Sequence, residues 1–315
     1  MRFALDETTQ TLRAAVADVL RSEVTPAVIR AGWPGGDWAI VSGVWDKLAD
    51  VGVIGTLLPE ADGGLGLDEN ALVPVLEEIG YSGLPVPAVE TIAVAGPYLT
   101  GRLMVAVETA PGEPVPFLGR AQRVVLISDG GLHVYETDTL EIEPGDSVDG
   151  SRWVGRVARQ PEGGVLLSGD AAAAWQRGVL GTAAVLCGLA RRMLDMTIGY
   201  VQRREQYGVP VGSFQAIKHT LADALVAVEF ARPMVLAAGW AQSVGAADAA
   251  LQTSAAKVLA SDAARQVART ALQCHGAMGY TTEYDLHLFA KRAWALAPSW
   301  GSSAWHRARI GEIIA

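Results

Sequence analysis

The chain has 315 residues, of which half are hydrophobic and 19% are charged, and its net charge is −9. This composition provides a sizeable buried core and argues against a disordered chain. The acidic balance argues against a general nucleic-acid binder, because phosphate contacts need clustered Lys and Arg. The net negative charge is still compatible with a local cationic pocket for an anionic cofactor.

The cysteines and the lengths of the apolar segments indicate the cellular compartment in which the protein is expected. Cys187 and Cys274 lie in apolar, helix-like segments, so we expect buried thiols in a reducing environment. CxxC, HExxH and His-rich patterns are missing from the sequence, so no metal site is expected. The N-terminal residues do not resemble a signal peptide, and the longest apolar run, 179–190, is too short to span a bilayer. We expect a soluble cytoplasmic protein with no membrane partner.

Residues 1–100 are predicted to form an N-terminal helical domain. Leu12, Val16 and Leu20 recur at helical spacing behind the possible cap Asp6. A later amphipathic helix with apolar residues between positions 72 and 79 is expected to end at Gly80, since glycine often terminates helices.

Residues 101–170 change to β-type patterning and predict a small β domain. Val124–Ile127 is a short apolar run, and Asp129-Gly130-Gly131 follows it as a hairpin signal. A second run, 132–135, comes directly afterwards. The region is too short for a large β-sandwich.

Residues 171–315 return to helical patterning. Three long segments, about 172–203, 213–242 and 246–275, are predicted as helices joined by short connections. With a shorter C-terminal helix they predict a four-helix bundle. The predicted fold is therefore mainly α, with an N-terminal helical domain (1–100), a shortened β domain (101–170) and a C-terminal bundle (171–315).

The stretch from Arg204 to Gln215, Arg-Glu-Gln-Tyr-Gly-Val-Pro-Val-Gly-Ser-Phe-Gln, joins the first two bundle helices. Arg204 offers a charged fork suited to phosphate oxygens, and Tyr207 an aromatic face beside it. Gln215 lies in the first turn of the next helix, where backbone N–H groups are free. These groups suit a dinucleotide pyrophosphate. The alternative is structural: Arg204 caps its own helix and Tyr207 packs under the turn.

A second stretch runs from Gln273 to Glu283 as Gln-Cys-His-Gly-Ala-Met-Gly-Tyr-Thr-Thr-Glu. Gly276 and Ala277 would let a ligand approach the backbone closely. The same residues would also serve as a helix C-cap followed by a turn. His275 is expected to be a structural histidine.

Together these motifs resemble the acyl-CoA dehydrogenase family. The C-terminal segments match its Arg-x-Gln-Tyr/Phe-Gly, Phe-Gln and Gln-x-His-Gly-x-x-Gly-Tyr-x-x-Glu patterns, with Ala277 in place of a more usual glycine. Near the N-terminus, the resemblance rests on segments 52–55, 59–60, 63–66 and 77–80. It implies a helical domain, a β domain and a four-helix bundle, and a dimer or tetramer with FAD lying across a subunit interface.

The resemblance also implies roles for individual residues. Arg204, Tyr207 and Gln215 would contact the pyrophosphate and adenosine end of a neighbouring subunit's FAD. Gln273, Gly276 and Ala277 would help to hold its adenine side, although Ala277 departs from the pattern.

The catalytic carboxylate of the family is missing. Members abstract the α-proton of an acyl-CoA thioester with a Glu placed just before a Gly-Thr/Ser pair, and Trp300 stands there in this chain. An indole has a donor N–H and no basic lone pair. No Asp or Glu occurs between Leu286 and Gly311, and the alternative place on the first bundle helix has no acid before Asp195. We therefore assign no catalytic residue.

One further departure affects the site. The segment after Val105 runs almost directly from one strand into the next, so the first half of the family's β domain, which walls the flavin ring, is missing. His287 and His306 could be proposed as replacement bases, but both are expected to be surface or packing residues.

Three functions follow from these observations. The first is a non-catalytic partner subunit of a heteromeric FAD-dependent acyl-CoA dehydrogenase, whose companion subunit brings the base. The second is a self-sufficient flavoenzyme with a relocated base, for which Glu283 and Asp285 are the nearest acids to the motif. The third is a flavin-free scaffold or acyl-CoA-binding protein. The family resemblance suggests bulky acyl-CoA substrates, such as steroid side chains, for truncated partner subunits.

Overall fold

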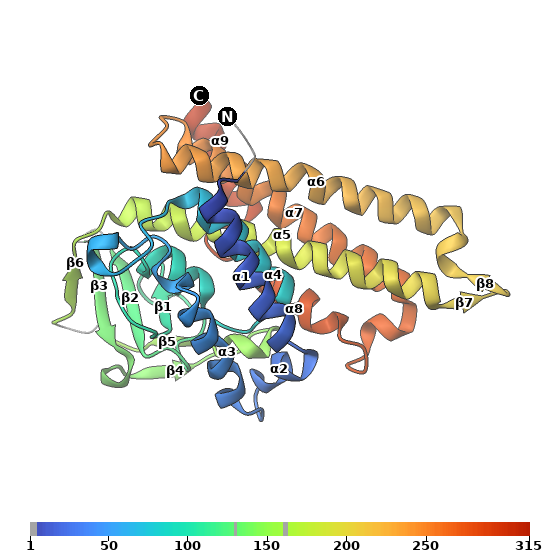
Figure 1. The fold of residues 1–315 in the computed structure, drawn as a ribbon, viewed down its shortest axis with the longest axis horizontal. Helices are drawn as coiled ribbons and strands as arrows, with labels where there is room; N and C mark the ends of the chain where they lie inside the picture. Colours follow the sequence, from blue (N-terminus) through green and yellow to red (C-terminus); the bar gives the residue numbers. More distant parts are fainter. Residues whose placement is uncertain (1–4, 129–130, 160–162) are drawn as a thin grey trace.

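The computed structural model of the protein describes residues 5–128, 131–159 and 163–315. The described elements follow the predicted order of helices, a small β region and a long helical bundle (Figure 1). The mainly helical fold class is therefore confirmed.

The N-terminal region packs four α-helices and short helical turns. Its α-helices are α1 (Glu7–Glu23), α2 (Pro26–Ala31), α3 (Trp38–Asp50) and α4 (Glu69–Ser82). The short turns are η1 (Val53–Gly55), η2 (Glu60–Asp62) and the π-helical turn η3 (Val89–Ala95). Asp6 caps α1 by accepting the Thr9 N–H at 2.8 Å, and the apolar face predicted for this helix is buried against α4.

Helix α4 differs from the sequence prediction at its C-terminus. The helix passes through Gly80 and ends at Ser82, where Gly83 adopts a left-handed φ of 75°. A Cβ atom on Gly80 would lie 2.3 Å from the carbonyl oxygen of Val185 on the next long helix. The prediction that Gly80 ends the helix was wrong, because this glycine permits close helix packing.

The β region forms one four-stranded sheet and one two-stranded sheet. The first has the order β1 (Val105–Glu108), β2 (Arg123–Ser128), β3 (Gly131–Glu136), β6 (Val165–Leu167), with β1 parallel to β2 and the other pairs antiparallel. The second pairs β4 (Ile142–Pro144) with β5 (Gly155–Val157). Residues 129–130 of the predicted hairpin turn lie outside the described residues, but the strands on either side pair from Ser128 opposite Gly131.

The C-terminal region is built on long helices. They are α5 (Ala171–Arg203), α6 (Gln215–Ser243), α7 (Ala249–His275), α8 (Leu286–Leu296) and α9 (Ser303–Ile314). Helix α5 packs against α4, α6, α7 and α8 and so connects the N-terminal helices to the bundle. A short hairpin, β7 (Glu205–Gln206) with β8 (Val209–Pro210), projects from the end of the bundle farthest from the β sheet (Figure 1).

The β sheet rests on the beginning of α5. Val105 and Val107 of β1 share a buried apolar cluster with Val179 of α5 and with Trp300, which lies between α8 and α9. This contact brings together segments from the N-terminal helices, the sheet and the bundle, and it places the cavity described below.

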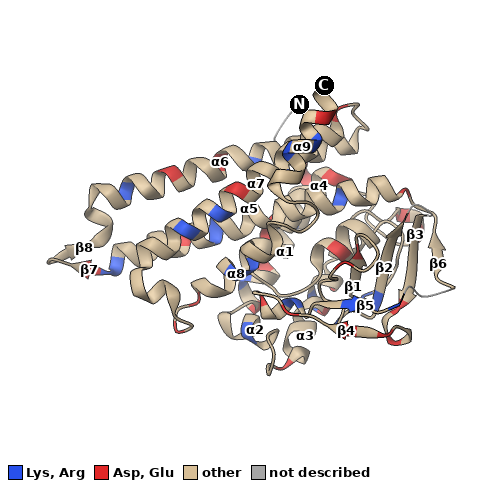
Figure 2. Ribbon diagram, turned by 180° about the vertical axis from the view of Figure 1, so that it is seen from behind, with Lys and Arg blue, Asp and Glu red and all other residues tan. Residues whose placement is uncertain are grey.

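Surface and thiol features agree with the composition. Figure 2 shows acidic and basic residues interspersed along α5, α6 and α7. Within the described ranges, no helix is long and apolar enough to cross a membrane, and no His/Cys/Asp/Glu group could hold a metal ion. Cys187 and Cys274 are free and buried as predicted, and burial raises the pKa of both thiols.

Candidate functional site

A cavity of about 410 Å³ opens where the three regions meet. Its walls come from η3, from β1 and the loop after it, from the 3-10 turn η5 (Gly150–Arg152), from the start of α5 and from the α8–α9 connection. We call this connection, residues 297–302, the Trp300 loop. Its buried charged side chains are Glu90 and Arg152, and Trp300 lies beside them. Glu113 and Asp146 also line the cavity but are exposed.

Trp300 fills part of the space between this loop and α5. Its side chain is 6% exposed, and its ring lies against Gly178, where an added Cβ would be 2.5 Å from the indole. Trp175 contacts the same ring edge-on at a centroid distance of 5.3 Å. The residue has a left-handed φ of 57°, which bulky side chains rarely adopt. An aromatic plug therefore stands where the family resemblance expects a catalytic carboxylate.

Glu90, like Arg152, is a cavity residue that the sequence analysis missed. It lies in η3, and Thr91 next to it accepts the Val105 N–H at 2.9 Å, which ties this turn to β1. Glu90 is 5% exposed. The available signal was a lone acid inside the apolar segment 84–95, which has to be explained because burying a charge is costly. The search for a base followed the C-terminal motif and did not consider an acid from the N-terminal helices.

The electrostatics of Glu90 favour a neutral carboxyl group. Burial raises its pKa, and this outweighs its own backbone hydrogen bond, the charges of Arg152 and Arg292, and a hydrogen bond with the Trp300 side chain, all of which lower it. Among the described ion pairs within 4 Å, none involves Glu90. A buried carboxyl with a raised pKa in a cavity is a candidate proton donor or acceptor.

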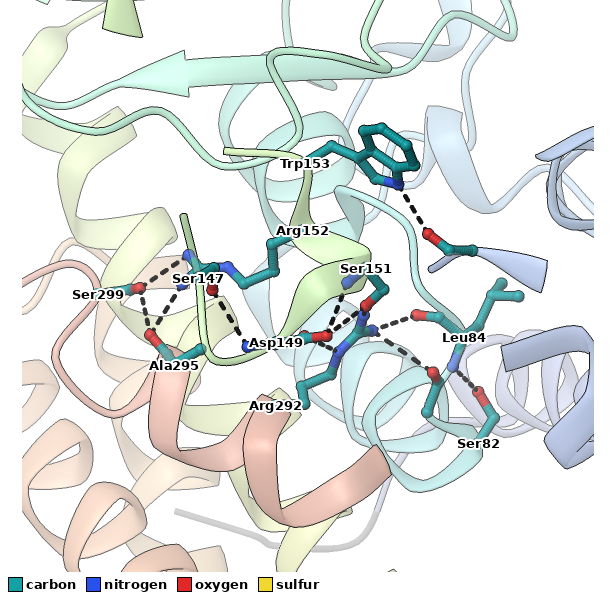
Figure 3. A network of polar contacts seen from close by, with 12 residues as sticks. Ser82, Leu84, Ser147, Asp149, Ser151, Arg152, Trp153, Arg292, Ala295 and Ser299 are labelled. Atoms are coloured by element: carbon teal, nitrogen blue, oxygen red, sulfur yellow. Dashed lines mark hydrogen bonds and ion pairs between the residues drawn. The ribbon is translucent and has the colours of Figure 1, made fainter. Parts of the chain in front are cut away.

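Arg152 supplies the positive charge of the cavity. Its guanidinium donates to the carbonyl oxygen of Ala295 at 2.9 Å and to the Ser299 hydroxyl at 3.0 Å, so it links η5 to the Trp300 loop (Figure 3). Its buried Nε finds no hydrogen-bond partner in the part of the chain that the structure describes. Burial lowers the Arg152 pKa, while Glu90 and Asp149 oppose this shift.

A second arginine fixes the position of η5. Arg292 of α8 donates from Nε to Asp149 at 2.9 Å, and its terminal nitrogens donate at 2.6 Å to the Leu84 carbonyl and the Ser151 hydroxyl (Figure 3). Burial alone would raise the Asp149 pKa, but Arg292 and Ser151 hold it below its usual value. This buried ion pair joins the N-terminal helices, the β region and the bundle behind the cavity.

The other acids and histidines proposed from sequence lie elsewhere. Asp285 pairs with Arg30 at 2.6 Å, and Glu283 is exposed. Asp195 accepts a hydrogen bond from the Tyr81 hydroxyl at 2.9 Å. His306 is a buried packing residue, as expected, and His287 stacks edge-on against Trp33. None of these side chains lines the cavity.

The residues predicted to bind FAD gather at the opposite end of the bundle. Helix α5 ends, α6 begins and α7 ends there, and Tyr200 stacks on His275 at 4.2 Å to join the first and last of these helices. The candidate residues are all exposed: Arg204, Tyr207, Gln215, Gln273, Gly276 and Ala277. The structure therefore brings them to the end of the bundle that carries the β7–β8 hairpin, away from the β sheet (Figure 1).

The exposed hairpin excludes the structural alternative for Tyr207. Its side chain is 93% exposed, so it does not pack under the turn. Tyr207 and Gly208 both have positive φ, 55° and 77°, as a two-residue type I′ turn requires. An aromatic side chain held outward on a strained turn is suited to contact another molecule. Figure 2 shows basic residues at the C-terminal end of α5, where the hairpin begins.

The chemistry of this end fits the diphosphate and adenosine part of a dinucleotide. Helix α6 begins after Phe214 with no side-chain cap, so its first N–H groups and its positive dipole are free to face an anion. Arg204 lies at the C-cap of α5 beside it. Gly276 has a φ of 60° and open space around its Cβ position, which leaves room for a ligand. These residues are therefore candidates for one side of such a site.

The comparisons with known proteins show the family. Residues 6–101 match the model of the acyl-CoA dehydrogenase N-terminal domain, and residues 171–315 match that of the C-terminal domain. The chain is 30% identical to acyl-CoA dehydrogenase IpdE2 of Mycolicibacterium smegmatis, over 92% of this chain and 93% of that protein. It is 33% identical to FadE34 of Mycobacterium tuberculosis, over 84% of this chain but 41% of that protein. The chain belongs to the acyl-CoA dehydrogenase family.

Solved structures agree with this assignment. A variant of the Tcur3481–Tcur3483 steroid acyl-CoA dehydrogenase (ACAD) superposes with a TM-score of 0.86 at 25% identity, over 98% of each chain. A chain of the ChsE4–ChsE5 complex from Mycobacterium tuberculosis has the same fold, with a TM-score of 0.84 at 21% identity over 100% of this chain and 99% of that one. The N-terminal helices, small β region and C-terminal helical domain are shared.

Proposed function

We propose that this chain is the non-catalytic partner subunit of a heteromeric, FAD-dependent acyl-CoA dehydrogenase. The observation that carries the proposal is the buried indole of Trp300 at the position of the family's base. The companion subunit would bring the carboxylate that removes the α-proton, the wall of the flavin ring and most of the acyl pocket. The whole assembly would be a dimer or tetramer that catalyses α,β-dehydrogenation of an acyl-CoA thioester.

The exposed end of the bundle would complete the companion's cofactor site. FAD, when bound, accepts the hydride from the β-carbon of the substrate. Arg204 and the free N-terminus of α6 would hold the pyrophosphate, and Tyr207 would cover the adenosine. Gln273, Gly276 and Ala277 would line the adenine side. Their exposure supports a role across a subunit interface, because a site enclosed within one chain would bury them.

The relatives suggest the class of substrate. One structural relative is called a steroid ACAD, and the chain matches IpdE2 over nearly its whole length. We propose a bulky acyl-CoA, such as a steroid side-chain thioester, as the substrate of the complex.

Substitution of Arg204 tests the shared site. The chain is co-expressed with candidate companion subunits, and the FAD content and acyl-CoA-dependent dye reduction of the purified complex are measured. Arg204→Ala should lower the affinity for FAD by about tenfold or more, since a charge-assisted phosphate contact contributes about 1.5–3 kcal/mol. Arg21→Ala, an exposed arginine on α1, is the matched control and should leave FAD binding unchanged. Unchanged FAD binding by the complex with Arg204→Ala would mean that this chain takes no part in the FAD site, as expected of a flavin-free scaffold.

A self-sufficient flavoenzyme is the second candidate, and Glu90 is the observation in its favour. Its carboxyl is buried in the cavity wall and its pKa is raised, as a relocated general base requires. This candidate predicts acyl-CoA dehydrogenation by the lone chain and its loss in Glu90→Gln. Activity of the complex that survives Glu90→Gln would assign the base to the companion.

A further inference from the structure

A buried lysine stands behind the Trp300 loop. Lys257 lies in α7 with a fully buried side chain. Its Nζ donates to the carbonyl oxygens of Ala297 at 2.8 Å and Gly301 at 3.1 Å, and to the Ser261 hydroxyl at 3.0 Å. An ammonium group has three hydrogens, so these contacts use all of its donors. Two of them hold the loop on either side of Trp300.

The charge of Lys257 is balanced by carbonyl dipoles. No carboxylate lies within 4 Å of it among the described ion pairs, and the nearby Asp262 pairs with Arg307 and accepts from Ser303. Ala297 is the C-cap of α8, where the helix dipole is negative and cations are stabilised. Lys257 therefore closes the C-terminus of α8 from a neighbouring helix.

His306 holds the carbonyl of Trp300 itself. Its Nε2 lies 2.9 Å from the Trp300 carbonyl oxygen and its Nδ1 lies 3.1 Å from the Ser254 hydroxyl. Because a carbonyl only accepts, Nε2 carries the hydrogen. The Trp300 φ of 57° is unfavourable for a bulky residue, so the loop needs such contacts to keep its conformation.

We propose that Lys257 is a positioning residue, which holds the Trp300 loop in its left-handed turn and thereby keeps the Trp300 indole in the cavity against Gly178. Without its hydrogen bonds to Ala297 and Gly301, the loop relaxes and the indole leaves its place beside Glu90. The indole then no longer fills its part of the cavity. The inference concerns the lone chain and does not depend on the proposed companion subunit.

The ionisation of Lys257 gives the clamp a pH dependence. Burial, helped by the positive charge of Arg265 and opposed by the negative charge of Asp262, lowers its pKa to about 7. The titratable and charged groups that face it are Asp262 and Arg265 on α7 and His306 on α9, whose own pKa is lowered by burial to about 4. Loss of the ammonium proton removes one donor, so the clamp weakens as the pH rises above neutrality.

The test follows Trp300 directly by ¹⁹F NMR of the full chain labelled with 5-fluorotryptophan. The resonance that disappears in Trp300→Phe identifies Trp300, and buried Trp45 of α3 serves as a remote reference. In Lys257→Met, which preserves the length of the side chain, the Trp300 resonance should shift and broaden while that of Trp45 stays. Lys218→Met removes an exposed lysine of α6 and should change neither resonance.

A pH titration of the labelled chain without substitutions provides a second measurement. The Trp300 resonance should titrate with a midpoint near 7, and this titration should vanish in Lys257→Met. The proposal is overturned if Trp300 keeps its shift and linewidth in Lys257→Met, or if Trp45 changes as much as Trp300. A titration that persists in the variant would assign the pH response to another group and would also overturn it.

Discussion

At the scale of single residues, the cavity pairs an aromatic plug with a buried acid. Trp300 comes from the bundle and Glu90 from the N-terminal helices, and a hydrogen bond between their side chains is among the influences on the Glu90 pKa. The acid is remote from solvent and has no ion-pair partner within 4 Å in the described ranges. Its protonation should therefore affect folding as well as any chemistry in the cavity.

Glu90→Gln should stabilise the protein at neutral pH. The pKa of Glu90 is raised above its ordinary value of 4.5, so its contribution to stability is lost as the pH rises through the native-state pKa. Glutamine cannot ionise, so the variant does not lose this stability at high pH. We expect its free energy of unfolding to exceed that of the natural chain by on the order of 1 kcal/mol at pH 7.5, and the difference to become smaller towards pH 4.5. Urea unfolding at both pH values measures it.

Glu60→Gln serves as the control for Glu90, since Glu60 is exposed. It should change stability little at either pH. A destabilised Glu90→Gln at pH 7.5 would contradict the account, because it would mean that Arg152 and Arg292 stabilise an ionised Glu90.

At the scale of elements, the buried pair Asp149–Arg292 positions η5 against α8. Asp149 accepts from Arg292 and from the Ser151 backbone and hydroxyl, and η5 also carries Arg152 into the cavity wall. The pair therefore determines where the positive charge of the cavity lies. Its removal should affect the β region and the bundle together.

Asp149→Asn should destabilise the fold by about 3–5 kcal/mol, because it leaves Arg292 buried without its counter-charge. Urea unfolding measures the loss. The double variant Asp149→Asn/Arg292→Met should be more stable than the sum of the single variants predicts, since they share one interaction. Asp146→Asn, an exposed acid of the same loop, is the control. Additive effects of the two substitutions would show that the pair is not coupled.

The helices also show which structural features could be predicted from the sequence and which could not. Helical periodicity predicted the long helices of the bundle to within about three residues at each end, because their apolar faces are continuous. Gly80 was misinterpreted because a glycine that ends a helix and one that permits close packing look alike in sequence. The position of Glu90 could not be predicted, because it meets Trp300 only after the N-terminal helices pack on the bundle.

At the scale of the whole molecule, the two ends of the bundle are suited to different tasks. The end beside the β sheet has a cavity partly filled by the Trp300 indole, and the opposite end has exposed groups that suit a dinucleotide. The motifs at the second end were recognisable from sequence because they are contiguous. Their separation from the cavity became visible only in the structure (Figure 1). Such a division is what a subunit needs if it completes a cofactor site on a companion.

The flavin content of the lone chain tests this account most directly. The protein is purified alone and with its companion, and bound FAD per chain and bleaching of the flavin by acyl-CoA are measured for both. The account predicts a colourless lone chain, and a yellow complex whose flavin is reduced by acyl-CoA. A lone chain with one FAD per protomer that acyl-CoA reduces would contradict it.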